Sequence, residues 1–498
     1  MILSLMTALA LGQGADAPEV SFSQRVPLEA LAGMETEDAV GRAGPDRSHV
    51  PAVIPPEILT LPAFSEVELA PGVRGLLMPV PGVRKVGVSV ILHKGQLDLD
   101  GDTTVASYLT GWTMDVASAR WGMAEMSSYT DMWDLSVGSW MEQRRTVVKL
   151  VAPKEALGRG LEVLEDVLLH PVFPEAEIKR QIKENKRYLL DNGPTDPKAI
   201  ARSAVAYGWA SPETPWGRRP DVKEWSKVRQ DDLIARHQAV LSAPVTVLVT
   251  GDLTWDEAQP MLQGLVSHLG GEGEALPPAD FTPPTERRVI AVSTPGLGQV
   301  QLMVRLAAPE RGSEDQGAFE LVNQVLGGSF LSRLNSNLRE EKGLTYGAYS
   351  SYGPDQTRGL WTLRFDTAVD KTALAVGQVE LELDRMAEGG MTDEELGWSR
   401  SQLISQWNGT LQTGSDAHTA AADWVEYGED PIVAREYIVG LGAVDVARSQ
   451  EVAARWLGPD APRVWVMVGD GEVLRQQLDA LGWQAEWITG DQALLGDL

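Results

Sequence analysis

An arginine and a tyrosine stand seven positions apart in LNSNLREEKGLTYGAYSSYG, residues 334–353, on either side of Gly343. A tyrosine hydroxyl is a proton donor near neutral pH, and an arginine can hold a carbonyl or carboxylate oxygen through paired hydrogen bonds. The spacing alone favours a plainer interpretation. In that interpretation Arg339 complements the dipole of a helix end and Tyr346 fills a hydrophobic core.

The surrounding residues predict the elements that position this pair. Leu331, Leu334 and Leu338 recur at i, i+3 and i+7, which is typical of an amphipathic helix. The glycine at position 343 is expected just past the helix end, and LTYGAYS continues with the composition of a strand. The arginine is therefore expected in the last helical turn, and the tyrosine three residues beyond the glycine, with both side chains facing one space.

Composition limits the classes of function. The chain has 498 residues, of which 43% are hydrophobic, enough for two to four domains with sizeable cores. Its 43 basic and 70 acidic side chains give a net charge of −27, and no Lys/Arg-rich patch is present, so nucleic acid is not expected as a partner. The absence of cysteine excludes disulfides, thiolate catalysis and every cysteine-based metal site.

The chain repeats itself with a period of about 218 residues. AEIKRQ at Ala176 and EELGWS at Glu394 each begin a charged helix, and the apolar runs VTVLVTGDL and RVWVMVGDG end in Gly251-Asp252 and Gly469-Asp470. Apolar runs of this length indicate buried strands. We therefore predict an α+β fold of two homologous domains, each a mixed β-sheet packed with helices and related by internal duplication.

The N-terminus has features of a secretory signal. MILSLMTALALGQGADA is an apolar run followed by an A-x-A-like cleavage site, and it is too short to span a bilayer. No lysine or arginine precedes Arg25, which is unusual for a signal. We expect export, to the periplasm or an equivalent compartment, and this division of the chain: signal peptide 1–17, Pro-rich segment 18–56, first domain 57–270, linker 271–286 and second domain 287–498.

Common catalytic motifs are absent. The chain contains no G-x-S-x-G elbow and no phosphate-binding G-x-x-x-x-G-K-[ST] loop, and its six histidines include no pair at i, i+4. GSDAH, from Gly414 to His418, is interpreted as the capped start of a helix rather than as part of a catalytic triad.

Four segments, in this order, resemble the pitrilysin/insulinase family of inverted-motif zinc peptidases. The resemblance extends from about residue 55 to the C-terminus and implies two such domains in one subunit, with two subunits closing around a peptide-degrading chamber. The segments are PVFPEAEIKRQ (171–181), PETPWGRRP (212–220), VLVTGDL (247–253) and LGGSFLSRLNSNLREEKGLTYG (326–347).

The family's zinc motif, H-x-x-E-H, falls on VASYLTGWTMD in this chain. Ser107 and Gly111 occupy the positions of the two histidine ligands, and Thr110 occupies that of the general base. Glycine offers no ligand, and threonine cannot accept a proton from water near neutral pH. Glu184 lies near the expected third ligand, but one carboxylate holds no catalytic metal. We expect no metal and no cofactor in this chain, and no peptidase activity from the chain alone.

The resemblance also implies a role for the opening pair. In active family members an arginine and a tyrosine reach from one half to the substrate bound at the zinc of the other half. Arg339 and Tyr346 match that motif, so we expect them to be catalytic. Gly327, Gly328 and Ser329 resemble the family's glycine-rich loop and are expected to bind substrate, with a helix-initiating turn capped by Ser329 as the alternative.

The leading hypothesis is therefore a non-zinc-binding subunit of a heterodimeric metalloendopeptidase. The expected partners are a homologous subunit with intact H-x-x-E-H, which carries Zn²⁺, and a peptide substrate; neither nucleic acid nor a membrane span is expected. The alternative is a catalytically inactive scaffold, which has no need of Arg339 or Tyr346. An active homodimer is excluded because both copies lack the ligands.

Overall fold

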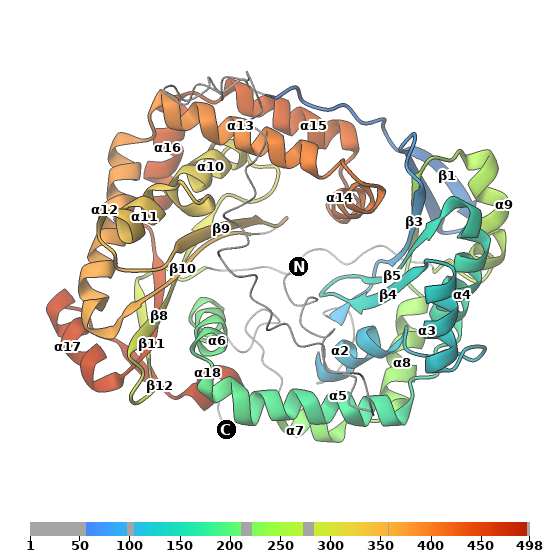
Figure 1. Cartoon of the computed structure of the whole chain (residues 1–498), viewed down its shortest axis with the longest axis horizontal. Coiled ribbons are helices and arrows are strands. Elements are labelled where there is room, and N and C mark those ends of the chain that lie inside the picture. Colours follow the sequence, from blue (N-terminus) through green and yellow to red (C-terminus); the bar gives the residue numbers. More distant parts are fainter. Residues whose placement is uncertain (1–55, 97–103, 211–221, 272–282, 357, 496–498) are drawn as a thin grey trace, which may run out of the picture. The chain divides into compact units, whose positions relative to one another are not determined.

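The computed structural model describes residues 56–96, 104–210, 222–271, 283–356 and 358–495. Residues 54–498 form one compact unit, shown in Figure 1. The expected signal peptide, 1–17, and nearly all of the Pro-rich segment, 18–56, lie outside the described residues. Within the described residues, none of the helices has the length and apolar character needed to cross a membrane.

The first half of the unit contains a six-stranded mixed sheet in the order β1-β2-β6-β3-β5-β4. Strands β2 and β6 are parallel, and every other neighbouring pair is antiparallel. The strands are β1 (Ser65–Ala70), β2 (Val73–Pro79), β3 (Lys85–Leu92), β4 (Ser136–Met141), β5 (Thr146–Pro153) and β6 (Val245–Gly251).

The second half contains a six-stranded mixed sheet in the order β12-β7-β11-β8-β10-β9. Strand β7 is parallel to both β12 and β11, and the remaining pairs are antiparallel. The strands are β7 (Arg288–Ser293), β8 (Gln299–Ala308), β9 (Ala348–Pro354), β10 (Gly359–Ala368), β11 (Arg463–Gly469) and β12 (Glu486–Ile488).

The two sheets confirm the predicted duplication and the α+β class. The order β2-β6-β3-β5-β4 in the first sheet corresponds, strand by strand and in direction, to β7-β11-β8-β10-β9 in the second. The helices follow the same offset: α5 (Glu175–Arg187) and α13 (Asp393–Gly409) begin 218 positions apart. Only the edge strands β1 and β12 differ in their place along the chain.

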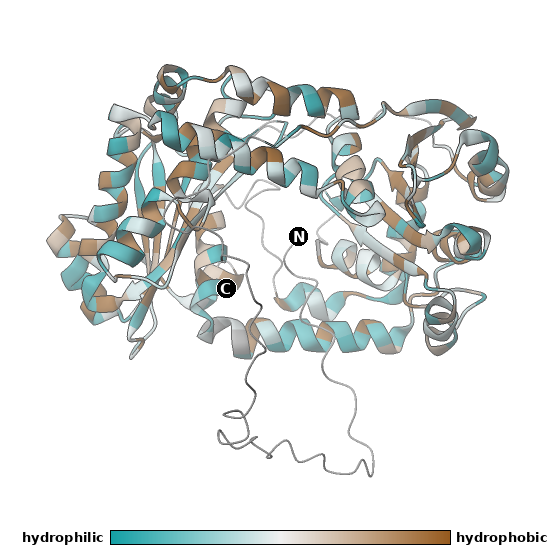
Figure 2. Cartoon of the chain, turned by 45° about the horizontal axis from the view of Figure 1, so that its top comes forward, coloured by the Kyte–Doolittle hydropathy of each residue, from teal (hydrophilic) through white to brown (hydrophobic). Residues whose placement is uncertain are grey.

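Helices of each half cover one face of that half's own sheet. Figure 2 shows the strands of both sheets largely in brown, and these helices carry both hydrophobic and hydrophilic positions. Their apolar sides complete two separate hydrophobic cores. The helices are α2 (Thr104–Thr113), α3 (Met123–Met132), α4 (Leu157–Leu169), α8 (Gln230–Leu241) and α9 (Trp255–Val266) in the first half, and α10 (Gln316–Asn323), α12 (Thr372–Gly389), α16 (Val446–Leu457) and α17 (Gly471–Leu481) in the second.

The opposite face of each sheet is covered by a helix from the other half. Helix α6 (Pro197–Trp209) packs on β8 and β11 of the second sheet, and helix α14 (Gly414–Glu426) packs on β3 and β6 of the first (Figure 1). A Cβ at Gly208 of α6 would lie 2.6 Å from the side chains of Ile290 and Val464, so glycine permits this close approach. This exchange was not predicted from the sequence.

Helix α14 is fixed to the first sheet by His418. The fully buried imidazole hydrogen-bonds through Nε2 to Ser89 Oγ at 2.8 Å and through Nδ1 to Thr250 Oγ1 at 2.9 Å. A Cβ at Gly87 would lie 2.4 Å from the imidazole ring, so the strand needs glycine there. The helix begins after its N-cap Thr413, which confirms the interpretation of this segment as a capped helix start.

Candidate functional site

Arg339 lies in the last turn of the helical stretch that precedes β9. This stretch consists of α11 (Arg333–Asn335) and the wider turn η6 (Ser336–Glu341). Gly343 follows with φ +59°, as predicted for a residue just past a helix end. The Gly343 amide donates to the carbonyl of Arg339 at 3.1 Å, which turns the chain away from the helix.

The predicted leucine stripe was wrong at one position. Leu334 and Leu338 are fully buried, but Leu331 is 75% exposed. The helix begins only after Ser332, so Leu331 belongs to the preceding loop and has no helical face to share. An exposed Leu331 and its neighbour Phe330, which is 54% exposed, leave an apolar tip beside the arginine.

Tyr346 lies two residues before β9 and is 83% exposed. It therefore does not fill the core, and the plainer interpretation of this tyrosine is wrong. The guanidinium carbon of Arg339 lies 5.1 Å from the centre of the Tyr346 ring and 4.8 Å from that of Phe330. Contacts of this kind are cation–π interactions, and they keep the arginine between two exposed aromatic rings.

Asn335 holds the two segments that carry these rings. Its fully buried side chain donates from Nδ2 to the carbonyl of Phe330 at 2.7 Å and accepts from the Ala348 amide at 3.2 Å. A buried asparagine with partners on both sides fixes the spacing between the Phe330 loop and the start of β9. Asn335 was not predicted from the sequence; a polar residue next to the buried Leu334 was the available signal.

The glycine pair has a structural explanation. Gly327 lies in the turn η5 (Gln324–Gly328), and a Cβ there would lie 2.5 Å from Ser350 Oγ on β9. A Cβ at Gly328 would lie 2.9 Å from Asn323 Nδ2. Both glycines thus allow this turn to pack tightly on its own domain. Their contact with substrate stays a prediction.

Ser329 directly follows these glycines and is nearly buried. Its hydroxyl has no hydrogen-bond partner among the described residues. The residue that precedes the next helix is Ser332, so Ser329 does not cap that helix. A role for Ser329 in substrate binding is likewise still a prediction.

The degenerate zinc-motif positions lie on α2 and are engaged within the protein. Ser107 Oγ accepts a hydrogen bond from the guanidinium of Arg236 at 3.0 Å. Thr110 Oγ1 donates to the carbonyl of Ala106 at 2.7 Å, one turn earlier in the same helix. A Cβ at Gly111 would lie 2.4 Å from the Met141 backbone nitrogen, so no larger residue fits there without movement of β4.

Comparison with known proteins agrees with the fold. Residues 227–403 match the family model described as peptidase M16 inactive domain. This part of the chain is thus similar to the peptidase M16 family. The expected resemblance to the pitrilysin/insulinase peptidases is thereby confirmed.

Relatives of this chain bear the name of zinc proteases. The uncharacterized zinc protease YmxG of Bacillus subtilis is 24% identical over 344 residues, which cover 67% of this chain and 80% of YmxG. The uncharacterized zinc protease SCO5738 of Streptomyces coelicolor is 30% identical over 119 residues, 24% of this chain and 23% of that protein.

Solved structures share the fold. The peptidase M16 inactive domain from Pseudomonas fluorescens superposes with a TM-score of 0.72 at 20% identity, covering 83% of this chain and 98% of that one. The periplasmic protease PqqL from Escherichia coli gives a TM-score of 0.67 at 12% identity, covering 85% of this chain and 49% of PqqL.

The residues at the M16 zinc-motif positions do not fit a zinc ion. Arg236 brings a positive charge onto Ser107, and a cation next to a metal site disfavours binding of the metal. Glu184 does not point to a shared site, since both of its carboxylate oxygens accept from Arg180 at 2.8 Å. Within the described part of the chain no group of three or more histidine, cysteine, aspartate or glutamate residues is arranged to hold a metal.

Proposed function

We propose that this chain is the non-zinc-binding subunit of a heterodimeric zinc metalloendopeptidase. It would form half of a peptide-degrading chamber and present Arg339 and Tyr346 to the active site of a homologous subunit that carries zinc on an intact H-x-x-E-H motif. Alone, the chain would hydrolyse no peptide. The observation that carries this proposal is the exposure of Tyr346, 83%, beside an arginine held in place by two aromatic rings.

The chemistry available to this pair suits peptide hydrolysis. Attack on a peptide carbonyl creates negative charge on its oxygen, and the Tyr346 hydroxyl can donate a hydrogen bond to that oxygen. The guanidinium of Arg339 can hold a second carbonyl or a carboxylate of the same peptide through paired hydrogen bonds. Because Arg339 contacts the Tyr346 ring, one bound peptide can reach both groups.

Two further observations support the need for a second subunit. The zinc-motif positions are closed by Arg236, by the α2 backbone and by the Met141 backbone, so this chain lacks the group that would activate water. The chain also spans only about half the length of PqqL and of the ferredoxin protease FusC, 49% in each, which leaves room in both for another unit of this size.

Reconstitution with a zinc-bearing partner tests the proposal. The natural candidate partner is a neighbouring gene product with intact H-x-x-E-H. We expect chelator-sensitive peptidase activity only from the mixture, and elemental analysis should find zinc in the partner but none in this chain. About one tightly bound zinc per copy of this chain would contradict the proposal. A stable complex without activity toward any peptide would point to the scaffold alternative.

We further propose that the protein is exported after removal of residues 1–17. The motivation is the apolar run followed by Ala15-Asp16-Ala17. Mass spectrometry of native material should then find an N-terminus near Pro18 in the periplasmic or secreted fraction. An intact Met1 in the cytosolic fraction would contradict export.

A further inference from the structure

A pocket of about 430 Å³ opens beside Tyr346, between helix α6 and the second sheet. Its walls come from two distant parts of the chain, because α6 belongs to the first half and the strands belong to the second. The residues that line it are Lys198, Arg202, Gln301, Met303, Tyr346, Gly347, Tyr349, Arg364, Phe365 and Asp366. We call this site the cationic pocket.

Positive charge converges on the cationic pocket from both walls. Lys198 and Arg202 stand one turn apart on α6 and therefore share a face of the helix. Arg364 of β10 is paired in register with Met303 of β8 on one side and with Tyr349 of β9 on the other, so its side chain leaves the sheet on the same face as theirs.

The positive charge continues along β8. Arg305 lies two residues from Met303, on the same face of the strand, and donates to Thr362 Oγ1 at 3.1 Å. Its guanidinium is partly buried, and this burial, together with the neighbouring Arg358, lowers the pKa of Arg305 to about 10. The face of β8 that carries Met303 thus holds a further cation.

Among the described residues, the cations of the cationic pocket are not used in ion pairs. Lys198, Arg202 and Arg364 form no ion pair with any carboxylate in the part of the chain that the structure describes, and Asp366 is the only acidic residue in the lining. Elsewhere arginines are paired closely, as with Arg333 and Glu395 at 2.6 Å. In a chain of net charge −27, three exposed cations that no described carboxylate pairs are available to an anionic ligand.

We propose that the cationic pocket binds a carboxylate of the peptide substrate and so selects acidic peptides. This inference rests on the proposed function, since it places the carboxylate next to the Tyr346 hydroxyl. Arginine and lysine bind carboxylates through charge-assisted hydrogen bonds, which are stronger than neutral ones. The carboxylate belongs either to an Asp or Glu side chain or to the C-terminus of the peptide.

Equilibrium binding to the full-length chain tests this inference without any turnover. Three fluorescent peptides of one sequence serve as probes: one with two glutamates and an amidated C-terminus, one with glutamines and a free C-terminus, and one with glutamines and an amidated C-terminus. We expect at least one carboxylate-bearing peptide to bind about ten-fold more tightly than the neutral peptide, with an advantage that shrinks as salt increases. Which of the two binds identifies the source of the carboxylate.

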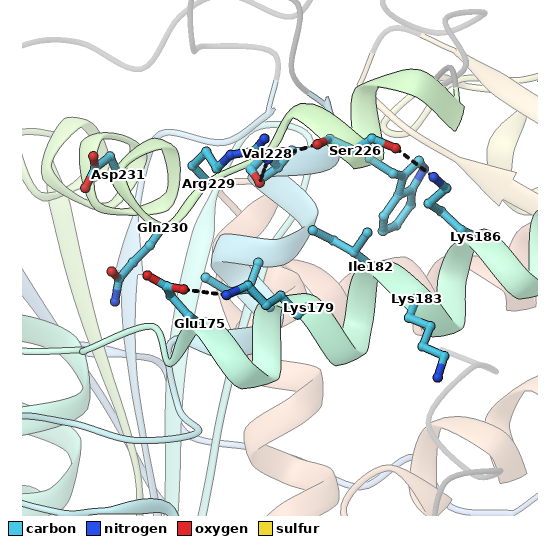
Figure 3. A pocket seen from close by; sticks show the side chains of 12 residues that line it. Glu175, Lys179, Ile182, Lys183, Lys186, Ser226, Val228, Arg229, Gln230 and Asp231 are labelled. Carbon is cyan, nitrogen blue, oxygen red and sulfur yellow. Dashed lines mark hydrogen bonds and ion pairs between the residues drawn. The ribbon is translucent and has the colours of Figure 1, made fainter.

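A matched pair of variants locates the binding. Lys198→Gln combined with Arg202→Gln should remove most of the preference, and a melting curve checks that these exposed substitutions leave the fold intact. Lys183→Gln is the control, because Lys183 is an exposed lysine of α5 in a different pocket of about 770 Å³ beside α7 (Val222–Lys227; Figure 3). It should leave the preference unchanged.

The outcomes separate the two proposals. Equal affinity for all three peptides, or an equal loss of the preference from Lys183→Gln, would overturn the carboxylate site. A preference for acidic peptides cannot come from the net charge of −27, because that charge by itself disfavours acidic ligands. Preferential binding of acidic peptides by a chain whose complex cleaves nothing would leave the carboxylate site standing and remove the proposed peptidase function.

Discussion

The guanidinium carbon of Arg339 lies 5.1 Å from the centre of the Tyr346 ring, although the two residues belong to different elements. The arginine ends a helix, and the tyrosine precedes a strand. The contact holds the exposed tyrosine ring beside the arginine. Asn335 supports this arrangement because it joins the start of the strand to the Phe330 loop, whose ring lies on the other side of the arginine.

Replacement of Tyr346 by phenylalanine should separate chemistry from packing. In the reconstituted complex we expect Tyr346→Phe to lower kcat by about 10² to 10³, which corresponds to the loss of one oxyanion donor. Complex formation and the melting temperature should not change, because the ring is 83% exposed. Tyr188→Phe, at another exposed tyrosine, is the control. Full activity of Tyr346→Phe would remove the catalytic assignment.

Arg339 should act mainly on substrate binding. We expect Arg339→Ala to raise KM more than it lowers kcat, because a guanidinium that holds a peptide contributes in the ground state as well. Arg339→Lys should restore little, since lysine lacks the planar pair of donors. Steady-state kinetics of both variants measure the effects on KM and on kcat separately. If Arg339→Lys has the KM of the unmodified chain, a positive charge without the planar pair of donors is enough to bind the substrate.

Gly111 should prevent the restoration of a zinc site. The triple variant Ser107→His, Thr110→Glu, Gly111→His recreates the motif, but a Cβ at Gly111 would lie 2.4 Å from the Met141 nitrogen. We expect Gly111→Ala alone to cost about 1–3 kcal/mol of unfolding free energy despite the helix propensity of alanine. Gly397→Ala is the control, because its Cβ has open space on α13, and it should stabilise by up to about 1 kcal/mol.

Urea unfolding and elemental analysis measure both effects. The triple variant should be less stable than the parent chain and should bind no stoichiometric zinc. A stable triple variant with one bound zinc would show that α2 and β4 adjust to the new side chains, and that the closed position is not the barrier.

Stability should depend on pH through His418. Burial, reinforced by the positive charge of Lys149, lowers the pKa of His418 to about 3, below the unfolded value near 6.5. As the pH falls, the unfolded chain therefore binds a proton before the folded chain does. The contribution of His418 to the unfolding free energy is complete above about pH 6.5 and is lost as the pH falls toward 3. The expected slope is about 1.4 kcal/mol per pH unit.

The comparison with His418→Gln isolates this slope. Other buried groups titrate in the same range, among them Asp115 with a pKa raised to about 6 and Glu426 with a pKa raised to about 7, both mainly by burial. Their effects cancel in the difference between the two proteins. We expect the unfolding free energy of the parent chain to fall relative to His418→Gln between pH 6.5 and 5. Parallel pH profiles would mean that His418 is not the titrating group.

Much of the fold was predictable because duplication repeats local signals. The Gly-Asp pairs at Gly251 and Gly469 end two buried strands that occupy the same place in their sheets. The helix end at Gly343 was also predictable, because a glycine with positive φ at a helix end is a local feature of the chain. Signals of this kind need only neighbouring residues.

The parts that were missed depend on contacts between distant residues. Arg236 reaches Ser107 across 129 positions, and no local pattern announces that contact. The exchange of α6 and α14 is of the same kind, although Gly87 inside a strand was a usable signal of close backbone approach. Leu331 shows a different error. The leucine spacing is typical of a helix, but the predicted helix was extended to a residue that lies before the actual helix start.

The exchange of helices sets an order of events during synthesis. Leu76, Ile91 and Leu248 of the first sheet are covered by residues of α14, which leave the ribosome 163 positions after Gly251 completes that sheet. At roughly 5–20 residues per second, this apolar face waits on the order of ten seconds for its cover. The nascent first half therefore exposes this apolar face until α14 has been synthesised, and we expect it to bind a chaperone or to self-associate reversibly until then.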